Sequence, residues 1–243
     1  MKPARKPRQI IRATAAATAV GLAALAGPPA WSAGPQLYSS GPSEDVAYVR
    51  FVNATGQPLD ILATADSGKA GKNAKAGQLH LDVAKPASAY MGVKPRSALA
   101  GRAQQGKNSI ALAPVANAGE LVSVIVWQGA DGKLGSTVIA ELPKNFNGLK
   151  ASVALYNADA ACPAAGLAAA DNNAMLFEKA VPGGLLRRPV NPVALKARAS
   201  CGAAAVGQAM DLGTLEAGQR YSVFLVPDRS ASRVLWARDE MPQ

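Results

Sequence analysis

The sequence is poor in the residues that most often carry out chemistry. Its 243 residues include two cysteines and one histidine, His80, and aromatic residues make up only 5%. It contains no Gly-x-Ser-x-Gly elbow and no phosphate-binding loop, and no Asp stands three positions before His80. We therefore expect no catalytic nucleophile–base pair, no metal site and no cofactor, and we predict that the protein is not an enzyme.

Long apolar runs are also scarce. The run at residues 13–26 is too short for a membrane span, which needs about 20 residues. Five basic residues and no acid precede it, and small residues that suit cleavage follow it. This pattern predicts a signal peptide over residues 1–33, cleaved on export to the periplasm; an uncleaved anchor is the alternative.

The two cysteines, Cys162 and Cys201, form an even pair in a chain that we expect to be exported. Such a pair is typical of a disulfide in an oxidising compartment. Two buried free thiols are the alternative. We predict the disulfide, which would close a loop of about 40 residues and stabilise the fold by roughly 3–4 kcal/mol.

The positive charge is modest once the signal segment is removed. Five of the 26 basic residues lie in that segment, which leaves 21 basic against 16 acidic residues. This balance permits an anionic polysaccharide as a partner, whereas nucleic acid does not fit an exported protein. The candidate basic contacts are Lys69, Lys72 and Lys75 in the loop 68–77, and Arg187 and Arg188. Solvated loops are the alternative interpretation of both sites.

Apolar and polar residues alternate with a period of two over several short runs, which predicts antiparallel β-sheet. The runs lie at residues 47–52, 58–66 and 77–84, and in two strands around an Asp-Gly turn at 129–132. Alanine favours helix, so we allow one helical turn within residues 160–170.

Two pairs of similar segments indicate an internal duplication. The sequence VRFVNA at 49–54 is similar to VALYNA at 153–158, and AGELVSVIV at 118–126 is similar to AGQRYSVFLV at 217–226. The offsets of 104 and 99 residues are nearly equal. We predict an all-β protein with two tandem antiparallel β-sandwich domains of similar topology, over residues 34–143 and 144–243, joined by a linker at 142–150.

The same segments resemble a known family. The start of the mature chain, LYSSGPSEDVAYVRFVNATG (37–56), is similar to the opening of the alginate O-acetylation protein AlgF, in which a Leu-Tyr lead precedes a Val-Arg-hydrophobic-hydrophobic-Asn-Ala strand. PVNPVAL (189–195) and RVLWAR (233–238) extend the resemblance into the second half. The loop 68–77 and the two cysteines depart from the family pattern.

The resemblance implies a periplasmic protein with paired β-sandwiches that is required for O-acetylation of an exopolysaccharide. Alginate is the first expectation, and cellulose is acetylated in related systems. The implied role is a non-catalytic adaptor that bridges a periplasmic O-acetyltransferase and a membrane O-acyltransferase component. The alternatives are a pair of polysaccharide-binding modules and an acetyltransferase.

Sandwich domains supply exposed edge strands that can pair with another chain. Two strands carry the expected contacts: the one with Tyr48, Arg50 and Val52, and the one with Ala154 and Tyr156. We therefore predict that Arg50 contacts a partner or a polymer if its strand lies at an edge.

Overall fold

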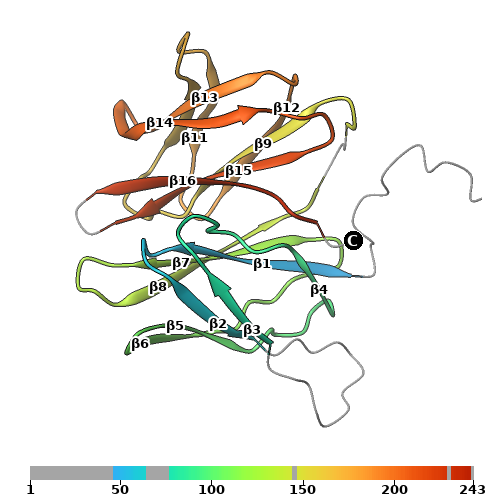
Figure 1. Ribbon diagram of the computed structural model, residues 1–243, viewed down its shortest axis with the longest axis vertical. Coiled ribbons are helices and arrows are strands. Elements are labelled where there is room, and N and C mark those ends of the chain that lie inside the picture. The colour runs from blue at the N-terminus through green and yellow to red at the C-terminus, as the bar shows by residue number, and fades with distance from the viewer. Residues whose placement is uncertain (1–45, 64–76, 144–146, 229–230, 242–243) are drawn as a thin grey trace, which may run out of the picture. The chain divides into compact units, whose positions relative to one another are not determined.

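The computed structural model describes residues 46–63, 77–143, 147–228 and 231–241. These residues contain sixteen β-strands and no helix. Residues 38–243 form one compact unit. We call β1–β8 the first half and β9–β16 the second half, coloured blue to yellow-green and yellow to red in Figure 1.

The strands of the first half are β1 (Ala47–Ala54), β2 (Leu59–Ala63), β3 (Gly77–Leu81), β4 (Met91–Val93), β5 (Gly101–Gln105), β6 (Asn108–Leu112), β7 (Leu121–Gln128) and β8 (Leu134–Glu141). Those of the second half are β9 (Ala151–Asn157), β10 (Ala165–Ala169), β11 (Met175–Ala180), β12 (Leu185–Val190), β13 (Ala194–Cys201), β14 (Ala204–Thr214), β15 (Arg220–Pro227) and β16 (Ser232–Arg238).

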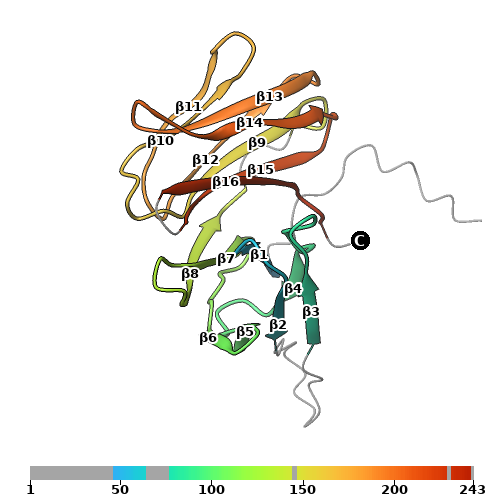
Figure 2. The same cartoon turned by 60° about the vertical axis from the view of Figure 1, so that its left-hand side comes forward.

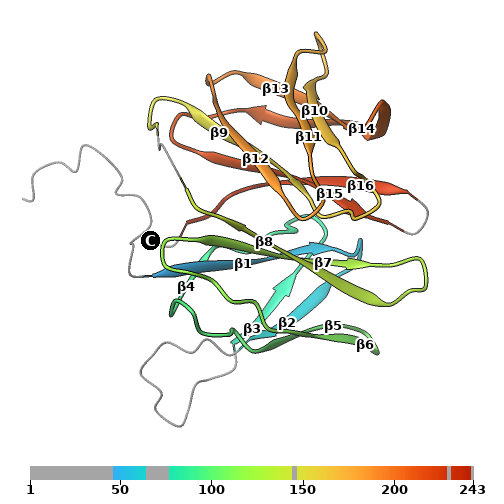
Figure 3. The same cartoon turned by 180° about the vertical axis from the view of Figure 1, so that it is seen from behind.

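The two halves have the same strand order. Each half has an inner sheet, β4-β1-β7-β8 or β12-β9-β15-β16, and an outer sheet, β3-β2-β5-β6 or β11-β10-β13-β14. Every strand of the first half has its counterpart eight strands later. The prediction of two tandem β-sandwiches of similar topology is confirmed, and Figure 3 shows the second pair of sheets from behind.

The sequence predicted antiparallel sheets, but each inner sheet contains one parallel strand pair. β1 pairs with β7 in parallel, and β9 pairs with β15 in parallel, at the centre of each inner sheet. Between β1 and β7 the chain passes through β2 and β3 of the outer sheet, β4 of the inner sheet, and β5 and β6 of the outer sheet, and β7 then runs in the same direction as β1. Only such a long crossover permits a parallel pair. All other strand pairs are antiparallel, including the predicted β7–β8 hairpin.

The central strands are buried on both faces because apolar side chains occupy both sides of each strand. On β1, Val49 and Phe51 enter the core of the first sandwich, whereas Val52 points into a separate core between the halves. On β9, Val153 and Leu155 enter the second sandwich, and Tyr156 points into the shared core. Three apolar layers therefore stabilise the two sandwiches and hold them together.

The expected helical turn at residues 160–170 is wrong: strand β10 lies there. β10 is hydrogen-bonded on both sides, to β11 and β13, and this pairing overrides the helix propensity of alanine. At Gly166 a Cβ atom would lie 2.6 Å from Ser200 Oγ, so a larger residue there would require the Ser200 side chain to move.

The predicted signal peptide lies outside the described residues. The predicted linker at 142–150 lies between the end of β8 at Glu141 and the start of β9 at Ala151. The domain boundary at residue 143 stays a prediction. Within the part of the chain that the structure describes, no helix has the length and apolar character of a membrane span.

Candidate functional site

A cluster of buried polar side chains lies between the two inner sheets. We call it the interhalf cluster; its members are Arg50, Tyr90, Ser123, Glu141, Tyr156, Arg187, Arg220, Ser222 and Asp239. Buried charges are stable only when they are paired and hydrogen-bonded, so such a cluster marks a specific packing arrangement.

Arg50 is the centre of the cluster. It projects from β1 and is fully buried. Its Nε donates to Ser123 Oγ at 2.8 Å, its Nη2 to Ser222 Oγ at 2.9 Å and its Nη1 to Asp239 Oδ1 at 2.7 Å. The guanidinium also lies over the ring of Tyr90, 4.6 Å from its centroid. One side chain thus bonds to residues of both halves.

Asp239 follows the end of β16 and is the main counter-ion of Arg50. Its Oδ1 also accepts a hydrogen bond of 2.6 Å from Ser222 Oγ, and its Oδ2 accepts one of 3.3 Å from Arg187 Nη2. Burial acts to raise the pKa of Asp239, but the positive charges of Arg50 and then Arg187 outweigh it and lower that pKa to about 2. Burial raises the pKa of Tyr90 well above its usual value, so this ring stays neutral.

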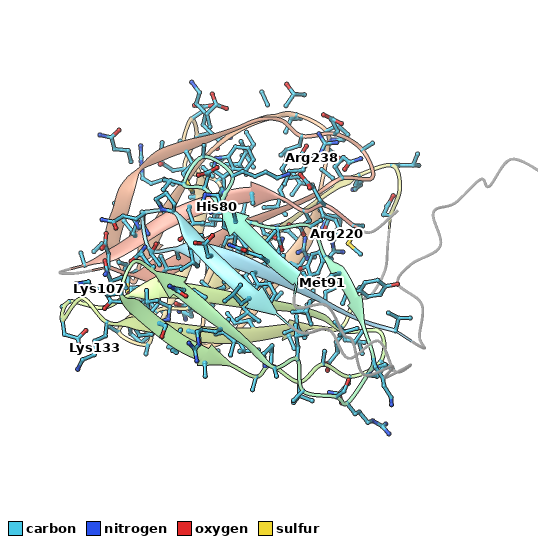
Figure 4. The ribbon with its side chains drawn as sticks, turned by 60° about the horizontal axis from the view of Figure 1, so that its bottom comes forward. His80, Met91, Lys107, Lys133, Arg220 and Arg238 are labelled. Carbon is cyan, nitrogen blue, oxygen red and sulfur yellow. A yellow bond between two sulfur atoms is a disulfide. The ribbon has the colours of Figure 1, made fainter. Side chains whose placement is uncertain are left out.

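Glu141 is the second acid of the cluster and ends β8. It accepts a hydrogen bond of 2.9 Å from Arg220 Nη2 and one of 3.2 Å from the Tyr156 hydroxyl. Arg187 Nε lies 2.7 Å from Glu141 Oε1 without the geometry of a hydrogen bond, so this contact is an ion pair by distance. Figure 4 labels Arg220, which lies in the second half.

The cluster follows the internal duplication. Ser123 and Ser222 occupy the same position of the repeated Ser-Val segment. The two acids also occupy matched positions. Glu141 lies opposite Leu121 of β7, and the backbone N–H of Asp239 donates to the carbonyl of Arg220 of β15, which is the residue that matches Leu121 in the repeat. Each half therefore supplies one carboxylate that pairs across to the other half: Glu141 with Arg187 and Arg220, and Asp239 with Arg50, while Arg187 and Arg220 of its own half also lie close to Asp239. This reciprocal pairing joins the halves.

The cluster is suited to holding the halves together rather than to chemistry. Its serines and carboxylates are buried and already bonded to arginines, and no imidazole is among its members. A serine hydroxyl without a base has no route to activation. Removing one partner of such a buried pair leaves an uncompensated charge, which makes each member important for stability.

The condition under which Arg50 was predicted to contact a partner, an edge position of its strand, is not met. β1 lies between β4 and β7, and β9 lies between β12 and β15, so neither is an edge strand. Arg50 has no exposed surface, because its guanidinium is enclosed between the halves. The same central position removes the basis for edge contacts through Tyr48, Val52, Ala154 and Tyr156.

Of the other predicted contacts, the structure describes Arg187 and Arg188, which differ in their surroundings. Arg187 is only 11% exposed and belongs to the interhalf cluster. Its neighbour Arg188 is exposed and donates a hydrogen bond of 3.2 Å to the Leu176 carbonyl. Lys69, Lys72 and Lys75 lie outside the described residues. The prediction of a disulfide is confirmed: Cys162 and Cys201 are bonded, with Cα atoms 5.5 Å apart.

His80 lies on the exposed face of β3 and is labelled in Figure 4. Its Nδ1 lies 2.8 Å from Asp60 Oδ1, and its Nε2 lies 3.4 Å from Asp82 Oδ1. The hydrogen bond to Asp60 raises the pKa of His80. Among the described residues, no group of three or more His, Cys, Asp or Glu side chains has the arrangement of a metal site.

Sequence reasoning missed the acids of the cluster. The repeated Ser-Val pair was a usable signal for Ser123 and Ser222, since two serines at matched positions of buried strands need a common partner. Nothing in the local sequence marks Glu141 or Asp239, because their arginine partners lie 79 and 189 residues away.

Comparison with known proteins gives structural likeness without a family assignment. Neither the models of known protein families nor the curated protein sequences match the chain. Among solved structures, the chain is similar to the C-terminal domain of AlgF from P. aeruginosa, with 22% identity and a TM-score of 0.32, over 37% of this chain and 98% of that one. It is also similar to putative cell adhesion proteins.

The one from Bacteroides uniformis has 9% identity and a TM-score of 0.27, over 82% of this chain and 99% of that one. The one from Bacteroides ovatus has 10% identity and a TM-score of 0.25, over 84% and 100%. Likeness at these levels carries no argument about function.

Proposed function

We propose that the protein is a non-catalytic periplasmic adaptor required for O-acetylation of an exopolysaccharide, with alginate as the first candidate and cellulose as the second. In this role it holds a periplasmic O-acetyltransferase and a membrane O-acyltransferase component together. It needs a fixed arrangement of two surfaces and no reactive group of its own.

The observation that carries the proposal is the position of the strand that resembles AlgF. In that strand, Arg50 bonds to Ser222 and Asp239 of the second half, and Asn53 bonds to the Leu81 carbonyl of the outer sheet. The Val-Arg-x-x-Asn-Ala pattern therefore specifies the joined double sandwich. A joined pair of domains is what an adaptor requires, because two partners must be held at a fixed separation.

The alternative of polysaccharide-binding modules has less support. Sugar-binding surfaces commonly use aromatic rings with apolar faces open to the ligand. Nine of the twelve aromatic residues are described, and each is buried or half-buried, so none belongs to the exposed class. Trp127 is half-buried and its Nε1 donates to Thr137 Oγ1 within the β7–β8 hairpin.

The proposal is tested by measuring the acetyl content of the secreted polysaccharide by proton NMR, in cells with and without this gene. We expect acetyl signals to disappear while polymer yield stays near normal, and the sugar signals identify the polymer. Restoring the gene should restore acetylation. Unchanged acetylation would refute the proposal, and binding of the purified protein to alginate or acetylated cellulose would then favour the alternative.

A further inference from the structure

Strand β8 is an unprotected edge. It ends the inner sheet of the first half and, among the described strands, it pairs only with β7 (Figure 2). An edge strand presents a row of unpaired backbone N–H and C=O groups. Proteins usually protect such edges with charges, proline, bulges, short length or a covering segment.

Other edges of this protein carry such protection. β12 contains Pro189, which has no backbone N–H, beside the exposed Arg188. β11 has an irregular register and holds Lys179 in a left-handed conformation, with φ of 59°. β4 is only three residues long.

On the side away from the interhalf core β8 carries Leu134, Ser136, Val138 and Ala140, and the last two of these are apolar and exposed. Val138 lies opposite Val124, a residue of the first sandwich core, so both point to the same side of the sheet. Yet Val138 is 46% exposed, Ala140 is exposed, and Leu142 just beyond the strand is 57% exposed. The only charged residue of β8 is Glu141, which is buried against Arg220.

In the second half, the strand that corresponds to β8 is the edge strand β16, and its side chains are protected. Val138 and Ala140 correspond to Trp236 and Arg238 of β16, because both pairs lie opposite matched residues of the repeat. Trp236 packs at the margin of the second sandwich core, and Arg238 forms an ion pair of 3.0 Å with Glu216. The counterpart edge is thus partly covered and charged.

The covering segment is strand β14. It has 11 residues, whereas its counterpart β6 has five. Gly207, with φ of 63°, allows β14 to bend so that a Cβ atom there would lie 3.4 Å from Val234 Cγ1 of β16. In the first half β6 ends at Leu112, shortly before Pro114, whose missing N–H prevents the strand from continuing. The stripe of Val138, Ala140 and Leu142 is what this shorter strand leaves uncovered.

We propose that β8 is the dimerisation edge of this protein and that its occupant is β8 of a second copy, paired antiparallel about a two-fold axis near Ile139. Self-pairing about a two-fold axis brings each side chain close to its own kind, so like charges would oppose it. The exposed row of β8 has no charge, and Val138 of one copy would lie opposite Ala140 of the other. This inference does not depend on the proposed function.

Sedimentation equilibrium of the purified protein tests the proposal. One added strand pair buries little area, so we expect a reversible dimer with a dissociation constant on the order of 10–100 µM. Ala140→Lys should weaken the dimer at least about tenfold, because it places two positive charges near the axis. Ala111→Lys is the matched control: it adds the same charge at an exposed alanine of β6 and should leave dimerisation unchanged.

A second variant removes any question of misfolding. Mixed in equal amounts, Ala140→Cys should form an intermolecular disulfide with Val138→Cys under air oxidation faster than with Ala111→Cys, and thermal unfolding of all the variants should match that of the wild type. A wild-type protein that stays monomeric up to about 300 µM would overturn the proposal, since even weak strand pairing is populated there. Equal dimerisation of the Ala140→Lys variant and the wild type, or equal cross-linking at both positions, would overturn it as well.

Discussion

The two halves have the same strand order but differ in how their sheets are fastened. In the second half the Cys162–Cys201 disulfide joins the segment after β9 to the end of β13. At the corresponding place in the first half, Gln105 at the end of β5 donates a hydrogen bond of 2.7 Å to Thr55 Oγ1 after β1. The same junction is therefore covalent in one half and a single hydrogen bond in the other.

A second fastening is shared by both halves. Asn53 Nδ2 donates to the carbonyl of Leu81, the last residue of β3, at 2.9 Å. Asn157 Nδ2 donates to the carbonyl of Ala180, the last residue of β11, also at 2.9 Å. In both cases a buried amide ties the inner sheet to the outer sheet. The duplication thus kept the amide and varied the junction beside it.

The arginines of the interhalf cluster differ between the halves. The first half places Arg50 on its central strand, with Tyr90 beside it. The second half has Ala154 at the equivalent position, and Arg187 of β12 lies next to it in the register. The second half therefore supplies its arginine to the cluster from β12, beside the position that Arg50 holds on the central strand of the first half.

The largest expected effect breaks the link between the halves. Arg50→Ala leaves Asp239 buried without its main counter-ion, so we expect the free energy of unfolding to fall by about 3–5 kcal/mol. Urea titration should then show the two halves unfolding in separate steps. Arg188→Ala, an exposed arginine, is the control and should change stability by less than about 0.5 kcal/mol. Equal stabilities of the two variants would contradict the structural role of Arg50.

Removing the Cys162–Cys201 disulfide tests whether the covalent bond stabilises the second half more than the first. The bond closes a loop with a sequence separation of 39 residues. The variant Cys162→Ala/Cys201→Ala should therefore lose about 2–4 kcal/mol, from a less constrained unfolded chain. Hydrogen exchange should show the loss in β9–β16 and leave β1–β8 near their wild-type protection. Equal loss of protection in both halves would show that they do not differ in this respect.

The amides of Asn53 and Asn157 should contribute similar free energies of stabilisation to the two halves. Asn53→Ala and Asn157→Ala each remove two hydrogen bonds from the amide to backbone carbonyls, so each should cost about 2–3 kcal/mol. Thermal or urea unfolding of the two single variants measures this directly. A difference of more than about 2 kcal/mol between them would show that the repeated asparagines are not equivalent.

Acid should weaken the link between the halves. The pKa of Asp239 is lowered to about 2 in the folded protein and returns to its ordinary value on unfolding. The stability from this group is therefore present above about pH 4 and is lost as the pH falls toward 2, on the order of 2 kcal/mol. Urea midpoints measured from pH 5 to pH 2 should fall more steeply for the wild type than for Asp239→Asn. Parallel pH curves would remove Asp239 as the cause.

The smallest expected effect lies at the junction in the first half. Gln105→Ala removes one part-buried hydrogen bond to Thr55 and should cost about 0.5–1.5 kcal/mol. The double variant Gln105→Cys/Thr55→Cys tests whether the first half can form a disulfide at this junction, as the second half does. A gain in stability under oxidising conditions that vanishes on reduction would support the equivalence of the two junctions.

Much of the fold was visible in the sequence. The alternation of apolar residues predicted β1, β2, β3 and the β7–β8 hairpin, and the repeated segments predicted two similar sandwiches. The parallel pairs were not predictable from local pattern, because parallel and antiparallel strands share the same period of two. The strand at 165–169 was not predicted either, since alanine-rich residues gain sheet structure only from neighbours on both sides.

The sequence by itself determined the disulfide partners, the β class and the twofold repeat, because these depend on residue counts and on short-range periodicity. Only the tertiary structure decided that Arg50 is an internal link and not a surface contact. The burial of a side chain depends on which sheets pack together, and the ion pair that Arg50 makes spans 189 residues of sequence. The same long-range packing decided that β8, and not β1 or β9, is the open edge of an inner sheet.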